Sequence, residues 1–282
     1  MADPAVVLQY LMPKRAMTWL GGKIANAQAG GITTEIIRRF VAYYRVNMEE
    51  ASNPAIESYA SFNAFFTRAL KPGARPLATT ALVCPVDGAI SQLGAIDGDQ
   101  IFQAKGHAYS TTALVGGDRA LAAQFEHGSF ATIYLSPKDY HRIHMPCAGR
   151  LRRMIHVPGA LFSVNPGTAR GVPGLFARNE RVVCVFDGEH GPFIMVLVGA
   201  TIVGSMATTW HGVVNPPRSS TLREWRYDDQ QVNLAKGAEM GRFLLGSTVV
   251  LLLPPRQFDF CSGLQPTAAV RLGQPLADLV NG

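Results

Sequence analysis

The chain has 282 residues and a mass of 30.4 kDa, and it carries a formal net charge of +6 at neutral pH. Apolar residues make up 48% of it and charged residues 16%, which is typical of a globular protein. We expect no transmembrane helix, since no apolar run reaches ~18–20 residues, no signal peptide, and no zinc knuckle or redox pair, since the four cysteines form no CxxC motif.

Most of the excess positive charge lies in the first 45 residues, where six Lys or Arg residues outnumber two acidic residues. Nucleic acid and anionic membranes are the usual partners of such a segment. Residues 6–29 have the apolar spacing of an amphipathic helix, and Pro13 predicts two short helices in place of one. After Gly30-Gly31, Thr33 or Thr34 is expected to cap a further helix that continues to Tyr44.

The apolar face of these helices has two interpretations. It packs on the protein's own core, or it lies in a membrane interface with Trp19 and Leu20 inserted and the basic side chains at the level of the headgroups. A nucleic-acid interface is less favoured, because the basic residues are sparse and no aromatic residues are arranged for stacking. We therefore expect no nucleic-acid partner.

The character of the chain changes after a short helix that is expected to begin near Ser61 and to end at Lys71-Pro72-Gly73. From about Leu82 onward, short apolar runs are separated by Gly, Pro and Asp, as strands are in a β-rich core. These runs are residues 83–90, 128–135, 181–186, 193–203 and 247–253. The expected fold is α+β, with a predominantly antiparallel β core and amphipathic N-terminal helices.

Residues able to perform acid–base chemistry stand in two of the stretches between these runs. Asp87 lies in Cys84-Pro85-Val86-Asp87-Gly88, where on its own it would be a turn residue. His141 and His144 lie three apart in the stretch from Tyr134 to Pro146. No carboxylate or Cys with ligand spacing accompanies them, so we expect no metal site and favour acid–base roles.

The Gly246–Ser247 step at the head of the last apolar run has two interpretations. It is a glycine bulge before a buried strand, or a reactive peptide bond, because glycine allows backbone angles that other residues resist. Asp87, His144 and Ser247 together supply an acid, a base and a hydroxyl. A triad is recognised by geometry and not by sequence order, and no GxSxG elbow is present, so the residues alone leave this site open.

Short motifs in a fixed order extend over nearly the whole chain. They are Leu8-Gln9-Tyr10-Leu11 with Pro13, Phe62-Asn63 with Phe65-Phe66, Pro85-Val86-Asp87-Gly88, residues 103–107 (QAKGH), Tyr134 to Pro146, residues 161–165 (LFSVN), residues 176–181 (FARNER), Val198-Gly199-Ala200, Val203-Gly204-Ser205, and Lys236-Gly237 through Gly246-Ser247-Thr248. In this combination the chain resembles the bacterial phosphatidylserine decarboxylases, which are proenzymes that make their own pyruvoyl cofactor.

The resemblance implies that the chain cuts itself between Gly246 and Ser247. The products would be a β chain, residues 1–246, and an α chain, residues 247–282, with a pyruvoyl group at its new N-terminus. His144, oriented by Asp87, would activate the Ser247 hydroxyl for attack on the Gly246 carbonyl. The resulting ester would eliminate to dehydroalanine, which hydrolyses to pyruvoyl and ammonia.

The reaction implied by the resemblance is decarboxylation of phosphatidylserine to phosphatidylethanolamine. The pyruvoyl group at residue 247 would form a Schiff base with the serine amine and accept the electrons left at Cα. His141 would protonate Cα, a step that suits an imidazole with a pKa near neutrality, and Tyr134 would assist it.

The resemblance also implies how the chain is organised in the cell. Residues 1–60 would form a helical membrane-associating region and residues 61–282 a catalytic β-rich domain. We expect an anionic membrane surface as a partner, a homodimer of processed αβ units, and a peripheral location at the cytoplasmic face of the bacterial inner membrane. Two alternatives are a pyruvoyl-dependent decarboxylase of a soluble amino acid and an uncleaved hydrolase that uses Asp87, His144 and Ser247.

Overall fold

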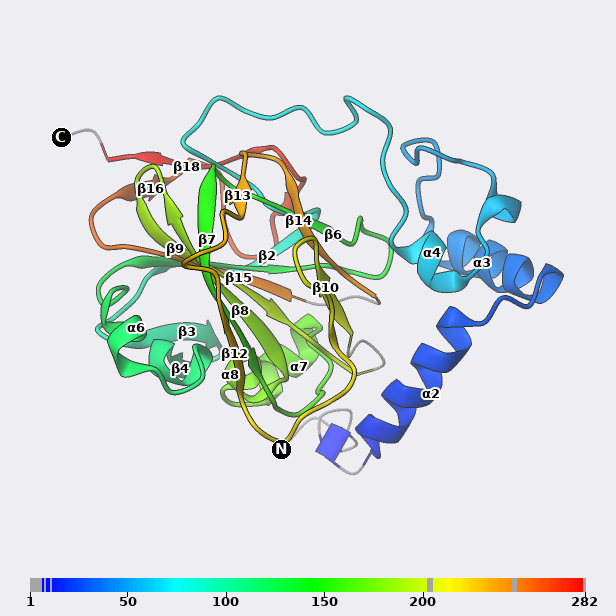
Figure 1. The fold of residues 1–282 in the computed structure, drawn as a ribbon, viewed down its shortest axis with the longest axis horizontal. Helices are drawn as coiled ribbons and strands as arrows, with labels where there is room; N and C mark the ends of the chain where they lie inside the picture. Colours follow the sequence, from blue (N-terminus) through cyan, green and yellow to red (C-terminus); the bar gives the residue numbers. More distant parts are fainter. Residues whose placement is uncertain (1–6, 8, 11, 202–204, 245–247, 281–282) are drawn as a thin grey trace.

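The computed structural model describes residues 7, 9–10, 12–201, 205–244 and 248–280 (Figure 1). A β-rich body makes up most of the molecule, and the N-terminal helices lie together on one side of it. All of the paired strands in the described part of the chain are antiparallel. The predicted α+β fold with an antiparallel β core is confirmed.

The N-terminal group of helices departs from the predicted boundaries in two places. Its members are α2 (Lys14–Asn26), α3 (Gly31–Tyr44), the short 3-10 helix η1 (Ile56–Ser58) and α4 (Phe62–Phe66). Helix α2 begins directly after Pro13, as predicted, because proline is tolerated at a helix start. Helix α3 begins before the predicted cap, and the Thr33 hydroxyl instead accepts a hydrogen bond from the N–H of Ala29, 3.0 Å away.

Helix α4 is shorter than the sequence suggested. Ser61 caps it as expected, since its side chain accepts from the N–H of Ala64. The helix nevertheless ends before Lys71-Pro72-Gly73, because residues 69–71 pair with residues 50–52 in an extended conformation. An isolated β-bridge between Ala51 and Leu70 therefore takes the place of the last turns of the predicted helix.

A nine-stranded sheet forms the centre of the β body (Figure 1). Its strand order is β12-β7-β8-β9-β15-β5-β2-β17, and β13 also pairs with β7. The strands are β2 (Gly88–Ala95), β5 (Ser129–Tyr134), β7 (Gly149–Val157), β8 (Arg181–Gly188), β9 (Gly191–Val198), β12 (Arg223–Arg226), β13 (Asn233–Leu234), β15 (Thr248–Leu253) and β17 (Ala269–Val270).

Strand β15 is buried on both faces of this sheet. Val249 and Leu251 belong to the hydrophobic cluster on one face, and Val250 and Leu252 to the cluster on the other. A strand covered on both sides has no need of polar alternation, which explains the continuous apolar run. The predicted core strand is confirmed from Thr248 onward, whereas Gly246 and Ser247 lie outside the described residues.

Three smaller sheets and four short helices complete the body. The sheets are β11-β10-β14-β6, β1-β18-β16 and β3-β4. Their strands are β1 (Leu82–Val83), β3 (Gln100–Ala104), β4 (His107–Ser110), β6 (Arg142–His144), β10 (Met206–Thr208), β11 (Gly212–Asn215), β14 (Glu239–Phe243), β16 (Phe258–Phe260) and β18 (Pro275–Leu279). The helices are α5 (Thr111–Leu114), α6 (Arg119–Ala123), α7 (Pro166–Gly171) and α8 (Leu175–Arg178).

Two of the predicted strand ranges are wrong in extent. Residues 83–90 belong to two strands in different sheets, β1 and β2, because Pro85 cannot donate a ladder hydrogen bond and the chain turns between the sheets at residues 84–87. The predicted strand over residues 193–203 ends at Val198 in the described part of the chain.

The helical group has a small core of its own, formed by Ala25, Ile37, Val46, Phe65 and Phe66. The division of the chain at residue 60 stays a prediction, and this core includes residues from both sides of that point. Among the described residues, no helix is both long enough and apolar enough to cross a bilayer.

Candidate active site

Strand pairing brings distant segments together at the start of β15. Thr248, which follows the predicted cleavage position, lies between Tyr134 of β5 and Val198 of β9. Tyr134 also pairs with Ala89 of β2, two residues after Asp87. Two of the predicted site residues, Asp87 and Tyr134, are therefore near the first described residue of the predicted α chain.

His144 reaches the same region through β6. Its backbone N–H donates to the carbonyl of Pro85 at 2.9 Å, which places β6 against the segment that carries Asp87. The other histidine of the motif, His141, precedes β6 directly, and its carbonyl accepts from the N–H of Phe243 at 3.0 Å. Phe243 is the last residue of β14, so both histidines lie beside strands that lead toward the predicted cleavage position.

Gly88 makes the close contact between β2 and β5 possible. A Cβ atom at this position would lie 2.3 Å from the carbonyl oxygen of Tyr134. Any other residue would force the two strands apart directly beside Asp87. This requirement explains the glycine of the Pro85–Gly88 motif.

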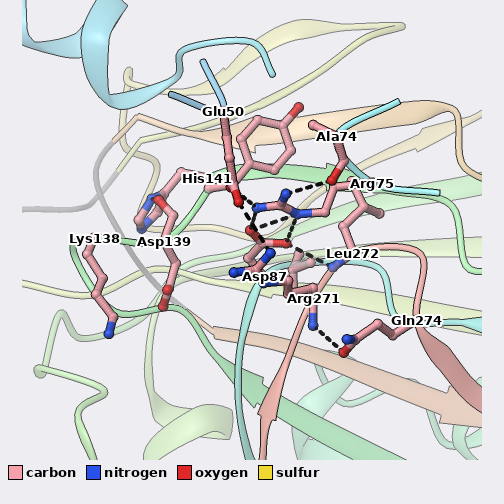
Figure 2. Close-up of polar contacts among 12 residues, drawn as sticks. Glu50, Ala74, Arg75, Asp87, Lys138, Asp139, His141, Arg271, Leu272 and Gln274 are labelled. Atoms are coloured by element: carbon pink, nitrogen blue, oxygen red, sulfur yellow. Dashed lines mark hydrogen bonds and ion pairs between the residues drawn. The ribbon is translucent and has the colours of Figure 1, made fainter. Parts of the chain in front are cut away.

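Asp87 lies at the end of the turn between β1 and β2 and is also a buried member of an ion pair. Its Oδ1 accepts from the Nε of Arg75 at 3.0 Å and from the N–H of Leu272 at 2.8 Å. Its Oδ2 accepts from the Nη2 of Arg75 at 2.6 Å, and the same nitrogen binds Glu50 at 2.6 Å (Figure 2). The acid of the predicted triad is thus fixed by residues from three separate segments.

His144 has the protonation state that a general base requires. Its Nδ1 lies 2.8 Å from the carbonyl of Gly237 and donates to it, and its Nε2 lies 3.1 Å from the hydroxyl of Tyr140 and accepts from it. Burial lowers the pKa of His144, although the bond to Gly237 and the negative charges of Glu239 and Asp87 oppose this effect. The imidazole is therefore neutral at neutral pH.

The structure places Asp87 near His144 without joining them by a hydrogen bond in the part of the chain that it describes. The ring of His144 bonds to Gly237 and Tyr140, whereas the carboxylate of Asp87 bonds to Arg75 and Leu272. Asp87 acts on His144 through its charge, which favours the protonated form of the imidazole.

His141 is completely buried. Its Nδ1 donates to the carbonyl of Asp139 at 2.8 Å, and its Nε2 has no hydrogen-bond partner among the described residues. Burial lowers the pKa of His141 to about 3, so the expectation of a pKa near neutrality is wrong for this state of the protein. His141 is a neutral imidazole whose Nε2 lone pair is unpartnered among the described residues.

A cavity of about 480 Å³ lies between the helical group and the β body. Its walls are mostly apolar, with Ile24, Phe40 and Phe66 on the helical side and Tyr134, Asn165 and Thr201 among the residues on the other. The ring of Phe66 also packs against His141, with 4.0 Å between the ring centroids. Tyr134 thus faces the cavity directly, and Phe66 stands between the cavity and His141.

Four residues with roles in this arrangement were not singled out from the sequence. They are Glu50, Arg75, Tyr140 and Gly237. Tyr140 and Gly237 lie inside sequence motifs, Tyr134 to Pro146 and Lys236-Gly237, so the sequence does indicate these two residues. Arg75 and Glu50 carry no local signal, because only the fold brings them to Asp87. Among the described residues, no group of three or more His, Cys, Asp or Glu side chains could hold a metal ion.

Comparison with known proteins identifies the family of this chain. The family model for phosphatidylserine decarboxylase matches residues 62–278, and a second model, named PSD, matches residues 4–45. The chain belongs to the phosphatidylserine decarboxylase family.

Two relatives in the family are similar over their whole length. The phosphatidylserine decarboxylase proenzyme of Variovorax paradoxus (strain S110) is 71% identical over 100% of both chains. That of Dechloromonas aromatica (strain RCB) is 68% identical over 98% of both chains. The resemblance seen in the sequence motifs is confirmed, and the cluster at the start of β15 is the candidate active site of this family member.

Proposed function

We propose that this chain decarboxylates phosphatidylserine to phosphatidylethanolamine, with a pyruvoyl group that it forms from Ser247 by self-cleavage. The observation that carries the proposal is the identity over full length with relatives named phosphatidylserine decarboxylase proenzymes. The convergence of Asp87, His144 and the segment beginning at Thr248 supports it.

In the proposed cleavage, His144 takes the proton of the Ser247 hydroxyl as that oxygen attacks the Gly246 carbonyl. The neutral imidazole is the form that this step needs. The Tyr140 hydroxyl bonds to Nε2 in the described state, so it moves aside before this nitrogen accepts a proton. The charge of Asp87 then stabilises the imidazolium, the role that a carboxylate plays beside histidine in hydrolytic triads.

A pyruvoyl group at residue 247 supplies the electron sink that decarboxylation of an amino acid requires. The neighbouring residues fit a polar group there, because the Thr248 hydroxyl and the Nε2 of His141 are both buried and without a partner among the described residues. In the proposed turnover, His141 holds and moves a proton at Nε2, and Tyr134 orients the substrate from the wall of the cavity.

Intact mass spectrometry of the purified protein, together with assays of product formation, tests the proposal. We expect one fragment that ends at Gly246 and one that begins at residue 247 and is blocked to Edman degradation. Phosphatidylserine vesicles should yield phosphatidylethanolamine, and free serine should not react. An active chain that stays intact would rule out the pyruvoyl group, and an intact chain that only hydrolyses its substrate would favour the uncleaved hydrolase. Carbon dioxide release from a free amino acid alone would favour the decarboxylase of a soluble substrate.

The helical group carries the exposed apolar side chains that a peripheral membrane protein needs. Ile32, Ile36 and Tyr43 lie on α3, and Trp19 and Leu20 lie on α2, all of them exposed. The spacing of the three on α3 places them along one side of that helix. We propose that these residues enter the interface of an anionic membrane at the cytoplasmic face of the inner membrane, and that the processed αβ units form a homodimer.

The triple variant Leu20→Ser, Ile32→Ser and Tyr43→Ser should bind vesicles with anionic lipid at least tenfold more weakly. The reason is that three apolar side chains can no longer be buried in the membrane interface. Cosedimentation at low and high salt measures the effect, and deletion of residues 1–30 should act in the same direction. The matched control replaces three exposed apolar residues of the β body, Val213, Leu222 and Leu279, by serine. Equal binding by both triple variants would show that the helices do not contact the membrane.

A further inference from the structure

We propose that Arg75 is a positioning residue for self-cleavage: it holds the carboxylate of Asp87 in place beside His144, and Glu50 holds Arg75. This inference rests on the proposed function, since it assigns a role in the self-cleavage step. The proposed action of Arg75 is through Asp87, with which it shares three hydrogen bonds.

The contact between Arg75 and Asp87 is a buried fork. The Nε of Arg75 lies 3.0 Å from one carboxylate oxygen and 3.2 Å from the other, and its Nη2 lies 2.6 Å from the second (Figure 2). The two side chains are 8% and 9% exposed. Two or more hydrogen bonds from a planar guanidinium fix the orientation of a carboxylate as well as its charge.

Arg75 is itself held on two further sides. Its Nη1 donates to the carbonyl of Ala74 at 2.8 Å, and its Nη2 donates to Glu50 at 2.6 Å. Glu50 in turn accepts from Arg271 at 3.2 Å, so two carboxylates and two guanidiniums alternate in a row. Arg271 and Leu272 follow residue 247, and the arrangement around Asp87 therefore includes both predicted fragments.

Arg75 and Glu50 both stay charged at neutral pH. Burial alone would lower the pKa of Arg75, but the bonds to Asp87 and Glu50 outweigh it and raise that pKa above its usual value. Burial alone would raise the pKa of Glu50, but Arg75 and Arg271 outweigh it and lower that pKa. Arg75 is thus a permanent cation beside the acid of the proposed triad.

The surroundings of Asp87 show why this cation matters. The other ionisable groups that interact with its charge are Arg68, Cys84, Asp139, Tyr140 and His144. Burial raises the pKa of Asp139, and the charge of Asp87 adds to that effect. Without Arg75, a buried carboxyl close to a second acid would keep its proton to a higher pH, and the charge that supports His144 would be lost.

The test follows self-cleavage of newly synthesised full-length chains. Wild-type and variant proteins are made by cell-free translation, transferred to buffers from pH 5 to pH 9 and sampled over time on denaturing gels. Arg75→Met should slow cleavage by roughly 10- to 100-fold, on the order of losing hydrogen bonds to a buried charge. The pH at which the rate is half-maximal should also rise, since the unpaired carboxyl ionises later. Arg75→Lys should restore part of the rate, because it returns the charge without the fork.

A matched control separates positioning from general stability. Arg153 also joins two carboxylates, with 2.8 Å to Asp118 and 3.0 Å to Glu224, at a place remote from Asp87 in the sheet. Arg153→Met should cleave at the wild-type rate with the wild-type pH profile. Circular dichroism identifies variants that fail to fold. If Arg75→Met is one of them, the rate and pH profile of Arg75→Lys test the role of Arg75.

The possible outcomes distinguish this inference from the proposed function. If the wild type is cleaved and Arg75→Met is cleaved with the same rate and pH profile, the role of Arg75 is overturned and the proposed function stands. Equal slowing by Arg75→Met and Arg153→Met overturns it as well, since the effect would then be structural. A wild-type chain that stays intact, like Ser247→Ala, overturns the proposed function and this role with it.

Discussion

Replacement of Ser247 by alanine is expected to leave the chain as a single intact polypeptide, and Asp87→Asn and His144→Ala should leave it largely uncut. Ser247→Ala removes the attacking oxygen. His144→Ala removes the base, a loss typically of ~10²–10⁴-fold in rate, and Asp87→Asn removes the charge that favours the imidazolium. Denaturing gels and intact mass of freshly made protein measure the fraction that is cut.

Variants of the same chemical type elsewhere in the chain serve as controls. Ser220→Ala changes an exposed serine, and Asp118→Asn changes a carboxylate that is also paired with an arginine. Both should be cut as fast as the wild type. Cleavage of His144→Ala at the wild-type rate would remove this histidine from the proposed cleavage step.

His141→Ala should have the opposite pattern, with normal cleavage and slow turnover. The residue lies behind Phe66 at the cavity and has an unpartnered Nε2, which suits a proton-transfer role in decarboxylation. Loss of such a group should reduce kcat by ~10²–10⁴-fold. The assay compares phosphatidylethanolamine formation per cleaved chain, and failure of His141→Ala to cut itself would show that the two histidines do not divide the work in this way.

The pH profile gives a second measurement for His141. Because burial lowers the pKa of His141 to about 3, its imidazole is neutral from pH 5 upward in the free enzyme. It should therefore add no ionisation to kcat/KM between pH 5 and pH 8. An ionisation near pH 6.5 in the wild type that disappears in His141→Gln, a variant that keeps a hydrogen-bonding side chain, would contradict this expectation.

Parts of the fold with a strong local pattern were predictable from the sequence. The continuous apolar run from Thr248 to Leu253 predicts a buried strand, and Pro13 predicts where α2 begins. The stretch around Pro85 was misjudged, because alternation of apolar residues does not show where a chain passes from one sheet to another. Helix α4 was misjudged because its C-terminal end is set by pairing with residues 50–52, far away in the sequence.

The candidate site divides in the same way. Asp87, His141 and His144 stand out from the sequence as residue types suited to acid–base chemistry, and strand pairing brings their segments together. Arg75 could not be found in this way, because an arginine in a loop is ordinary until the fold buries it against a carboxylate. The low pKa of His141 is likewise a property of its complete burial, which no local pattern reveals.

The position of β15 determines the order in which synthesis, folding and the proposed cleavage take place. The strand is held between β5 and β9 by ladders from Thr248 to the far end, so the last segment of the chain has to be synthesised and folded in before the candidate site exists. The proposed cleavage would then take place only after folding is complete, and a misfolded chain would acquire no cofactor. After the proposed cut, the ladders of β15 with β5 and β9 would hold the two products together, so that cleavage would be a maturation step without dissociation.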